Sequence, residues 1–211
     1  MRKLGSLISG MAIGVGTLPL GLALDPANAH AQVRVELTPF VGSYYALSNL
    51  GRQAANEKER QANQPALGAV LFARLTPVIG VEGAFAFTAS GTNVTSTGTV
   101  TNQGYSGNII FASGRVRLSV PRTNLYGLAG AGIVRRGGQA WNSPVFTKLT
   151  NVAGVVGAGT RAEVSAAVRI DVKAEAQFYS LDPDGSGTAY ASKLQTDVIF
   201  GVGIPISFSR H

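Results

Sequence analysis

The stretch V-R-I-D-V-K-A-E-A-Q-F, residues 168–178, alternates between apolar and polar side chains without interruption. Its apolar set runs from Val168 to Phe178, and the polar residues between the members of that set are Arg169, Asp171, Lys173, Glu175 and Gln177. A period of two is typical of a β-strand whose two faces meet different surroundings. The stretch therefore predicts a strand, and it leaves open which of the two faces lies on the outside.

The rest of the chain repeats this strand signal with a regular spacing. Eight strands are predicted, at 33–47, 66–75, 78–88, 105–119, 124–136, 151–161, 166–179 and 196–209. Long polar connections (48–64, which we expect to be mobile, around 89–104, around 137–150, and 181–195) alternate with short ones (75–77, 120–124 and near 162–165). This alternation is typical of an up-and-down barrel in an outer membrane, with short periplasmic turns and long external loops, and it differs from the mixed connections of a Greek-key sandwich.

The composition of the two strand faces favours a membrane barrel over a soluble one. In the last strand one face is apolar and free of charge, as lipid contact requires: Val198, Phe200, Val202, Ile204, Ile206 and Phe208. The opposite face carries Asp197, Gly201, Gly203 and Ser207, with Ile199 as the exception. Small residues recur on the polar faces, at Gly68, Gly80, Ala84 and Ala86. A narrow lumen filled by side chains needs such a mixture of small and large residues, so we expect the apolar faces to meet lipid and the polar faces to line the lumen.

Charged side chains in such a lumen should pair across strands, because an isolated charge in a confined space is strongly unfavourable. The predicted lumen charge network is structural and consists of Glu36, Arg74, Glu82, Arg115, Arg117, Arg169, Asp171, Lys173 and Glu175, with Glu163 as a further candidate partner. An eight-stranded barrel is about wide enough inside for side chains alone. A plugged lumen is therefore expected, and a narrow ion path through these charges is the alternative.

The first 31 residues have the features of a secretory signal peptide. Arg2 and Lys3 precede an uncharged stretch, 4–24, and small-x-small cleavage sites follow that would cut after Ala29 or Ala31. A membrane anchor is the alternative for 4–24, although its glycines and prolines argue against it. We thus expect a signal peptide at 1–31 and a barrel domain at 32–211. The chain has no cysteine, which excludes disulfides and a lipid anchor on an N-terminal cysteine.

The composition suits an exported β-protein more than a nucleic-acid-binding protein. The chain contains 27 glycines, 14% charged residues and a net charge of +7. Without 1–31 it would keep 16 basic and 10 acidic residues, a net charge of +6. Its basic residues are scattered, with no run longer than Arg135-Arg136, and export also argues against nucleic acid.

Recognisable catalytic and metal-binding patterns are missing from the predicted mature chain. His211 is its one histidine, at the terminus, so a Ser-His or Asp-His site is not available and we expect no enzymatic activity. D-P-D-G-S-G at 182–187 lacks the third ligand and closing Glu of a calcium loop, and we interpret it as a turn. N-V-T at 93–95 is interpreted as a polar loop, and the sequence predicts no cofactor and no metal.

Four segments resemble small bacterial outer-membrane β-barrel proteins of the kind represented by the outer membrane protein A transmembrane domain. They are E-L-T-P-F-V-G at 36–42, N-I-I-F-A-S-G-R-V-R at 108–117, L-Y-G-L-A-G-A-G-I-V-R at 125–135 and V-I-F-G-V-G-I-P-I-S-F at 198–208. The resemblance covers essentially 33–209 and implies an all-β fold, an eight-stranded antiparallel up-and-down transmembrane β-barrel. It also implies contact with outer-membrane lipid and with the barrel-insertion machinery. Family members commonly end on an aromatic residue, whereas this chain continues after Phe208 with Ser209-Arg210-His211.

Two classes of function follow. The first is a monomeric, non-enzymatic outer-membrane barrel with a charged, side-chain-filled lumen and external loops for envelope integrity or surface interaction, whose loop partner the sequence does not name. The alternatives are a soluble, lipocalin-like periplasmic or secreted barrel that binds a small apolar ligand, and a narrow pore.

Overall fold

The computed structural model of the chain describes residues 34–51, 57–96, 99–101, 106–141, 149–165, 168–181 and 193–208. The predicted signal segment, the D-P-D-G-S-G stretch and His211 lie outside these residues, and the side chains of 93–95 are not described. Among the described residues no helix is long and apolar enough to cross a membrane.

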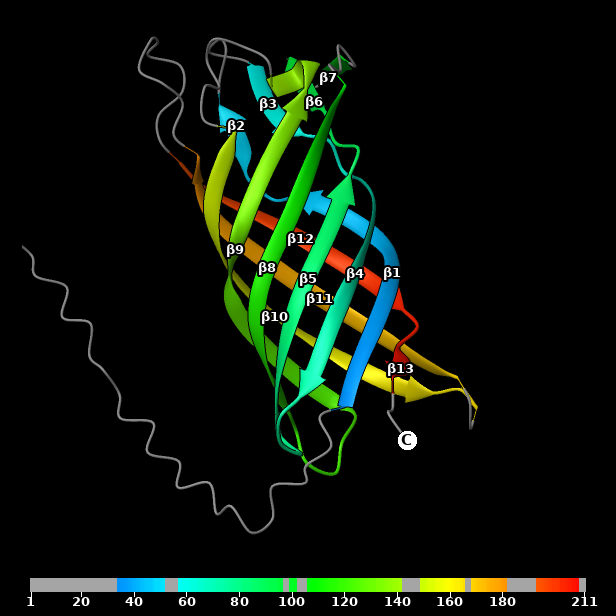
Figure 1. Ribbon diagram of the computed structural model, residues 1–211. Coiled ribbons are helices and arrows are strands. Elements are labelled where there is room, and N and C mark those ends of the chain that lie inside the picture. The colour runs from blue at the N-terminus through cyan, green and yellow to red at the C-terminus, as the bar shows by residue number, and fades with distance from the viewer. Residues whose placement is uncertain are drawn as a thin grey trace, which may run out of the picture. The chain divides into compact units, whose positions relative to one another are not determined.

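Eight antiparallel strands form a closed barrel, as Figure 1 shows. They are β1 (Arg34–Ala46), β4 (Gln64–Arg74), β5 (Ile79–Thr88), β8 (Gly107–Ser119), β9 (Leu125–Gly138), β10 (Thr150–Glu163), β11 (Arg169–Leu181) and β12 (Lys193–Gly203). Each strand pairs with the next along the chain, and the pairing of β1 with β12 closes the ring. The predicted fold class is confirmed, and the predicted strand bounds lie within a few residues of those observed.

The last strand of the barrel is broken near its end by Pro205. β12 stops at Gly203, and β13 (Ile206–Phe208) resumes the pairing with β1, from Leu37↔Ile206 to Val35↔Phe208. Proline has no backbone N–H to donate to the ladder, which explains an interruption at this position. The Ile204 amide still donates to the Pro39 carbonyl at 3.2 Å and holds the broken strand against β1.

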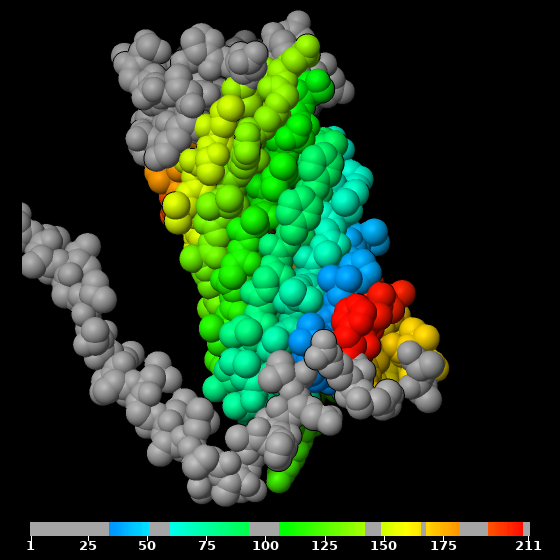
Figure 2. All heavy atoms as spheres, viewed as in Figure 1, coloured from blue at the N-terminus to red at the C-terminus, as the bar shows by residue number. Residues whose placement is uncertain are grey.

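The outer face of the wall is apolar, and the inner face carries the charged side chains together with a buried apolar cluster. Along β11, Asp171, Lys173, Glu175 and Gln177 are buried in the lumen, whereas Val172 is 42% exposed on the outer face. Figure 2 shows the outer side chains of neighbouring strands packed in oblique bands over the visible face. Exposed apolar side chains cover this outer surface, among them Val41, Leu67, Leu71, Phe85, Val116, Leu118, Ile133, Val152, Val156, Phe200 and Val202.

The long connections contain secondary structure that the alternation of apolar and polar residues does not predict. β2 (Asn49–Gly51) and β3 (Glu57–Gln61) lie in the first connection, and β6 (Thr92–Ser96) and β7 (Thr99–Thr101) lie in the second. These four strands form a separate sheet in the order β2-β3-β6-β7, and a short 3-10 helix, η2 (Gln139–Trp141), opens the third connection. The first connection is therefore partly a sheet rather than only a mobile loop, because its β3 pairs with β6 of a different connection. Alternation within one segment does not reveal such a pairing.

Candidate functional site

The half of the lumen nearest the short turns holds a continuous chain of ion pairs, which we call the ion network. Its members, in the order in which they are joined, are Arg34, Glu36, Arg161, Asp171, Arg117, Glu82, Arg115, Glu175 and Lys173. They come from β1, β5, β8, β10 and β11. The network thus ties together strands that do not all neighbour one another in the sheet.

Each carboxylate of the ion network contacts at least two cations. Glu36 lies 3.0 Å from Arg34 Nε through Oε1 and 2.6 Å from Arg161 Nη1 through Oε2. Glu82 lies 2.9 Å from Arg115 Nη2 through Oε2 and 3.2 Å from Arg117 Nη1 through Oε1. Without Arg34, whose side chain is 38% exposed at the rim, the network has four cations and four anions. Such a balance is what a buried group of charges requires.

Aromatic rings surround the cations of the network and supply one further hydrogen bond. The Tyr126 hydroxyl donates to Asp171 Oδ1 at 2.5 Å. The Arg117 guanidinium carbon lies 3.4 Å from the Tyr126 ring centroid, and Lys173 Nζ lies 4.0 Å from that of Phe40. These are cation–π distances, so the rings partly replace the water that the charges lose.

Small residues on the polar face create the room that these long side chains occupy. A Cβ at Gly201 would lie 2.9 Å from Cδ2 of Phe40 and 3.4 Å from Cε of Lys173. A side chain at this position would therefore displace the Lys173–Phe40 contact. This is the packing reason for the glycines that the sequence shows among charged residues.

Beyond the ion network the lumen is filled with apolar side chains. Phe40, Val70, Phe111, Val134 and Ile199 belong to one buried cluster. Ile199, the apolar exception on the polar face of its strand, is fully buried there. A cavity between the network and this cluster, lined in part by Phe40, Glu82, Arg117, Asp171 and Lys173, measures about 10 Å³, which is room for about one water molecule.

A second polar cluster lies at the end of the lumen nearest the long connections. The Tyr44 hydroxyl donates to Gln61 Oε1 at 2.6 Å, Gln61 Nε2 donates to the Tyr179 hydroxyl at 3.3 Å, and that hydroxyl donates to Asp197 Oδ2 at 2.5 Å. Gln61 ends β3 and is buried, so a residue of the first long connection closes this relay inside the barrel.

Arg136 fixes the neighbouring part of this cluster. Its Nη1 donates to Asn151 Oδ1 at 2.9 Å, and its guanidinium carbon lies 4.7 Å from the Tyr179 ring centroid and 5.1 Å from that of Trp141. Trp141 belongs to η2, so the third long connection is also packed onto the lumen residues. This end of the barrel is thereby covered by groups from two connections.

The structure places seven of the predicted charge-network residues together and two of them elsewhere. Arg74 is exposed at the end of β4 and forms no ion pair with a described residue. Arg169 pairs with Glu163 at 3.2 Å at the rim, where the two side chains are 38% and 69% exposed. Both lie beyond the narrow part of the lumen, at strand ends, where water replaces the need for a buried partner.

Arg161 and Arg34, which complete the ion network, and Tyr126, which donates to its Asp171, were not predicted. Arg161 Nε pairs with Asp171 Oδ2 at 3.0 Å, in addition to its contact with Glu36. Its strand is built mostly of glycine, alanine and valine on both faces, so alternation does not assign an inward face there. Among the described residues no group of three potential metal ligands is present.

No protein-family model and no curated protein matches the chain, but solved structures match its fold. The crystal structure of the outer membrane protein OprG from Pseudomonas aeruginosa aligns with a TM-score of 0.55 over 84% of this chain and 97% of that chain, at 10% identity. The solid-state NMR structure of the outer membrane protein AlkL in DMPC lipid bilayers aligns with a TM-score of 0.56 over 100% of this chain and 98% of that chain, at 12% identity. The chain has the fold of these outer-membrane barrels, which confirms the fold that its sequence resemblance implied.

Proposed function

We propose that this protein is a monomeric, non-enzymatic barrel of the bacterial outer membrane whose lumen is closed and whose long connections carry its external role. The observation that carries this proposal is the distribution of polarity. Among the described residues, nine charged side chains are buried inside the barrel, while large apolar side chains are exposed over its outer wall. In water the exposed apolar wall would be unfavourable, whereas in a bilayer lipid covers it and the charges stay paired inside the lumen.

The orientation follows from the connections. The beginning of β1, all of β13 and the short turns lie at one end of the barrel, and the long connections with their small sheet belong to the other (Figure 1). In outer-membrane barrels the short turns face the periplasm. The sheet formed by β2, β3, β6 and β7 would therefore face outward, where envelope integrity or surface interaction is its expected role. Insertion would use the barrel-insertion machinery, and nucleic acid is not an expected partner.

The filled lumen favours a structural protein over a pore or a ligand carrier. An ion path would have to pass both the apolar cluster around Phe111 and Ile199 and the cavity of about 10 Å³. A lipocalin-like carrier would need an apolar internal cavity of several hundred Å³. The described lumen instead contains the ion network, so this soluble alternative is the weaker hypothesis.

Membrane location is tested by fractionation and by heat-dependent gel mobility. We expect the mature chain in the outer-membrane fraction, with a folded form that migrates differently from the heated form. Recovery in the aqueous periplasmic fraction without detergent would overturn the proposal. In planar bilayers we expect no stepwise conductance from the purified barrel. Reproducible channels would show that the lumen is open and would favour the narrow pore.

A further inference from the structure

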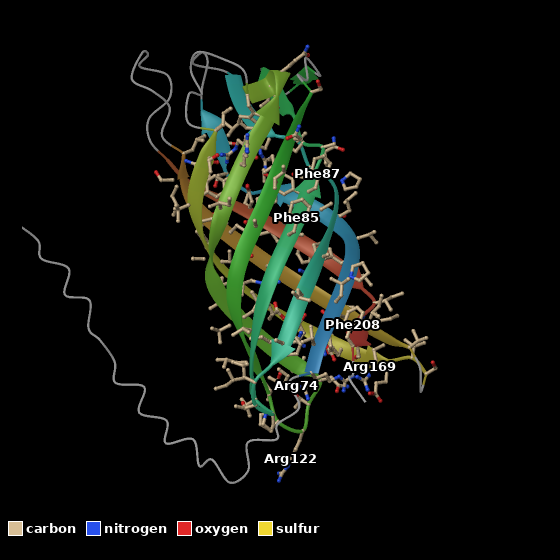
Figure 3. The ribbon with its side chains drawn as sticks, viewed as in Figure 1. Arg74, Phe85, Phe87, Arg122, Arg169 and Phe208 are labelled. Carbon is tan, nitrogen blue, oxygen red and sulfur yellow. The ribbon has the colours of Figure 1, made fainter. Side chains whose placement is uncertain are left out.

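Each short turn of the barrel carries one arginine that lies outside the ion network. Arg74 ends β4, Arg122 lies in the turn between β8 and β9, and Arg169 begins β11. Figure 3 shows the three labelled at the same end of the barrel, with Arg122 at the tip of its turn. Three turns that are far apart in the sequence therefore present cations on one rim.

Two of the three rim cations, Arg74 and Arg122, are not neutralised within the described part of the protein, whereas Arg169 pairs with Glu163. Arg74 and Arg122 are exposed, and their side chains form no hydrogen bond or ion pair with a described residue. Arg74 also stands directly opposite Arg34 in the pairing of β1 with β4, and like charges in this arrangement are unfavourable. Glu36, the nearest carboxylate to Arg34, is already shared with Arg161. An external anion would relieve this repulsion.

The same turns expose apolar side chains beside the arginines. Leu75 follows Arg74 and is 48% exposed, Val120 precedes Arg122 by two residues and is 47% exposed, and Val168 precedes Arg169 and is 41% exposed. A soluble anion would leave these apolar groups in water. The interface of a bilayer accommodates both kinds of group, because apolar side chains enter the acyl region while guanidinium groups bind phosphate oxygens.

We propose that Arg74, Arg122 and Arg169 form a binding rim for the phosphate groups of anionic phospholipids in the leaflet on the short-turn side. This inference rests on the proposed membrane location and adds to it a lipid class and the residues that select it. Arginine suits this role since its planar fork can donate two parallel hydrogen bonds to one phosphate. Glu163, which pairs with Arg169, would reduce the attraction at one of the three turns.

Spin-labelled lipids provide the test. The protein is reconstituted in phosphatidylcholine vesicles that contain a trace of spin-labelled phosphatidylglycerol or spin-labelled phosphatidylcholine, and electron paramagnetic resonance measures the motionally restricted fraction of each. We expect about a two- to fivefold preference for phosphatidylglycerol at low ionic strength, which falls as salt is added. The triple variant R74Q/R122Q/R169Q should show a preference near one, and each single variant should lose part of it.

Two controls separate this rim from general charge effects. Arg135 is exposed near the other end of β9, and R135Q should keep the full preference. E163Q frees Arg169 and should raise the preference. A wild-type barrel that enters the vesicles but shows no preference, or a triple variant that keeps it, would overturn this inference alone. A wild-type chain that does not enter phosphatidylcholine vesicles at all would overturn the proposed membrane function and this inference with it.

Discussion

Arg115 of β8 and Glu175 of β11 form a buried ion pair across the lumen, although two strands separate them in the sheet. Their side chains are 0% and 3% exposed. Glu175 also accepts from Lys173 Nζ at 3.1 Å, and Arg115 also pairs with Glu82. A buried pair of this kind contributes little net stability by itself, but removal of one partner leaves an uncompensated charge in a confined space.

Loss of the Glu175 carboxylate should destabilise the barrel strongly. In E175Q the side chain keeps its size, but Arg115 and Lys173 lose their shared anion, so we expect a loss of about 3–5 kcal/mol in the free energy of unfolding. Urea unfolding of the barrel in lipid vesicles measures it. E163Q is the matched control, since its pair with Arg169 is exposed and should contribute at most about 1 kcal/mol. Equally small losses in the free energy of unfolding of both variants would mean that water reaches the charged face of the lumen.

Charge balance, rather than any single contact, should determine the stability of the ion network. The double variant K173M/E175M removes one cation and one anion together and leaves Arg115 paired with Glu82. We expect it to recover most of the stability that E175Q loses, because apolar side chains can replace a buried ion pair with little loss. The same unfolding measurement decides the matter, and a double variant less stable than E175Q would contradict the role of balance.

The space at Gly159 should be essential for the contact between Tyr126 and Asp171. A Cβ at Gly159 would collide with the end of the Tyr126 ring, so G159A should displace the hydroxyl from Asp171 and destabilise the barrel by about 1–3 kcal/mol. G154A is the control on the same strand, since a Cβ there meets no atom within 4 Å and should be neutral or slightly stabilising. Similar unfolding free energies for the two variants would refute the packing explanation.

The Gln61 relay should hold the first long connection onto the barrel. In Q61L the hydrogen bonds to Tyr44 and Tyr179 are lost, so local opening should require about 1–3 kcal/mol less free energy. Trypsin should then cleave after Arg60 about fivefold faster or more, while the heat-dependent gel mobility of the barrel stays unchanged. Q64L, at an exposed position of β4, should leave the cleavage rate unchanged. If trypsin cleaves Q61L and the wild type after Arg60 at the same rate, these hydrogen bonds do not hold the first long connection onto the barrel.

Local pattern predicted the wall of the barrel because each strand meets two environments along its whole length. The side-chain period of two assigned Asp171, Lys173 and Glu175 to the interior and Val172 to the exterior, and the structure confirms that assignment. Ile199 departs from the alternation because it faces the lumen at the level of the apolar cluster, where an apolar side chain is required. Where both faces of a strand are small or apolar, as around Arg161, the pattern carries no such information.

The sequence by itself determined the eight wall strands, the long and short connections between them and the face of most side chains where the two faces differ, since these depend on neighbours within one segment. Only the tertiary structure decided which charges pair, because Glu36, Arg161 and Asp171 meet through the closure and stagger of three different strands. It also decided that β3 pairs with β6 from another connection, that Gln61 enters the lumen, and that Arg74 and Arg169 remain at the rim. The stretch from Val168 to Phe178 specifies a strand with a charged inner face, and the barrel around it selects the partners of those charges.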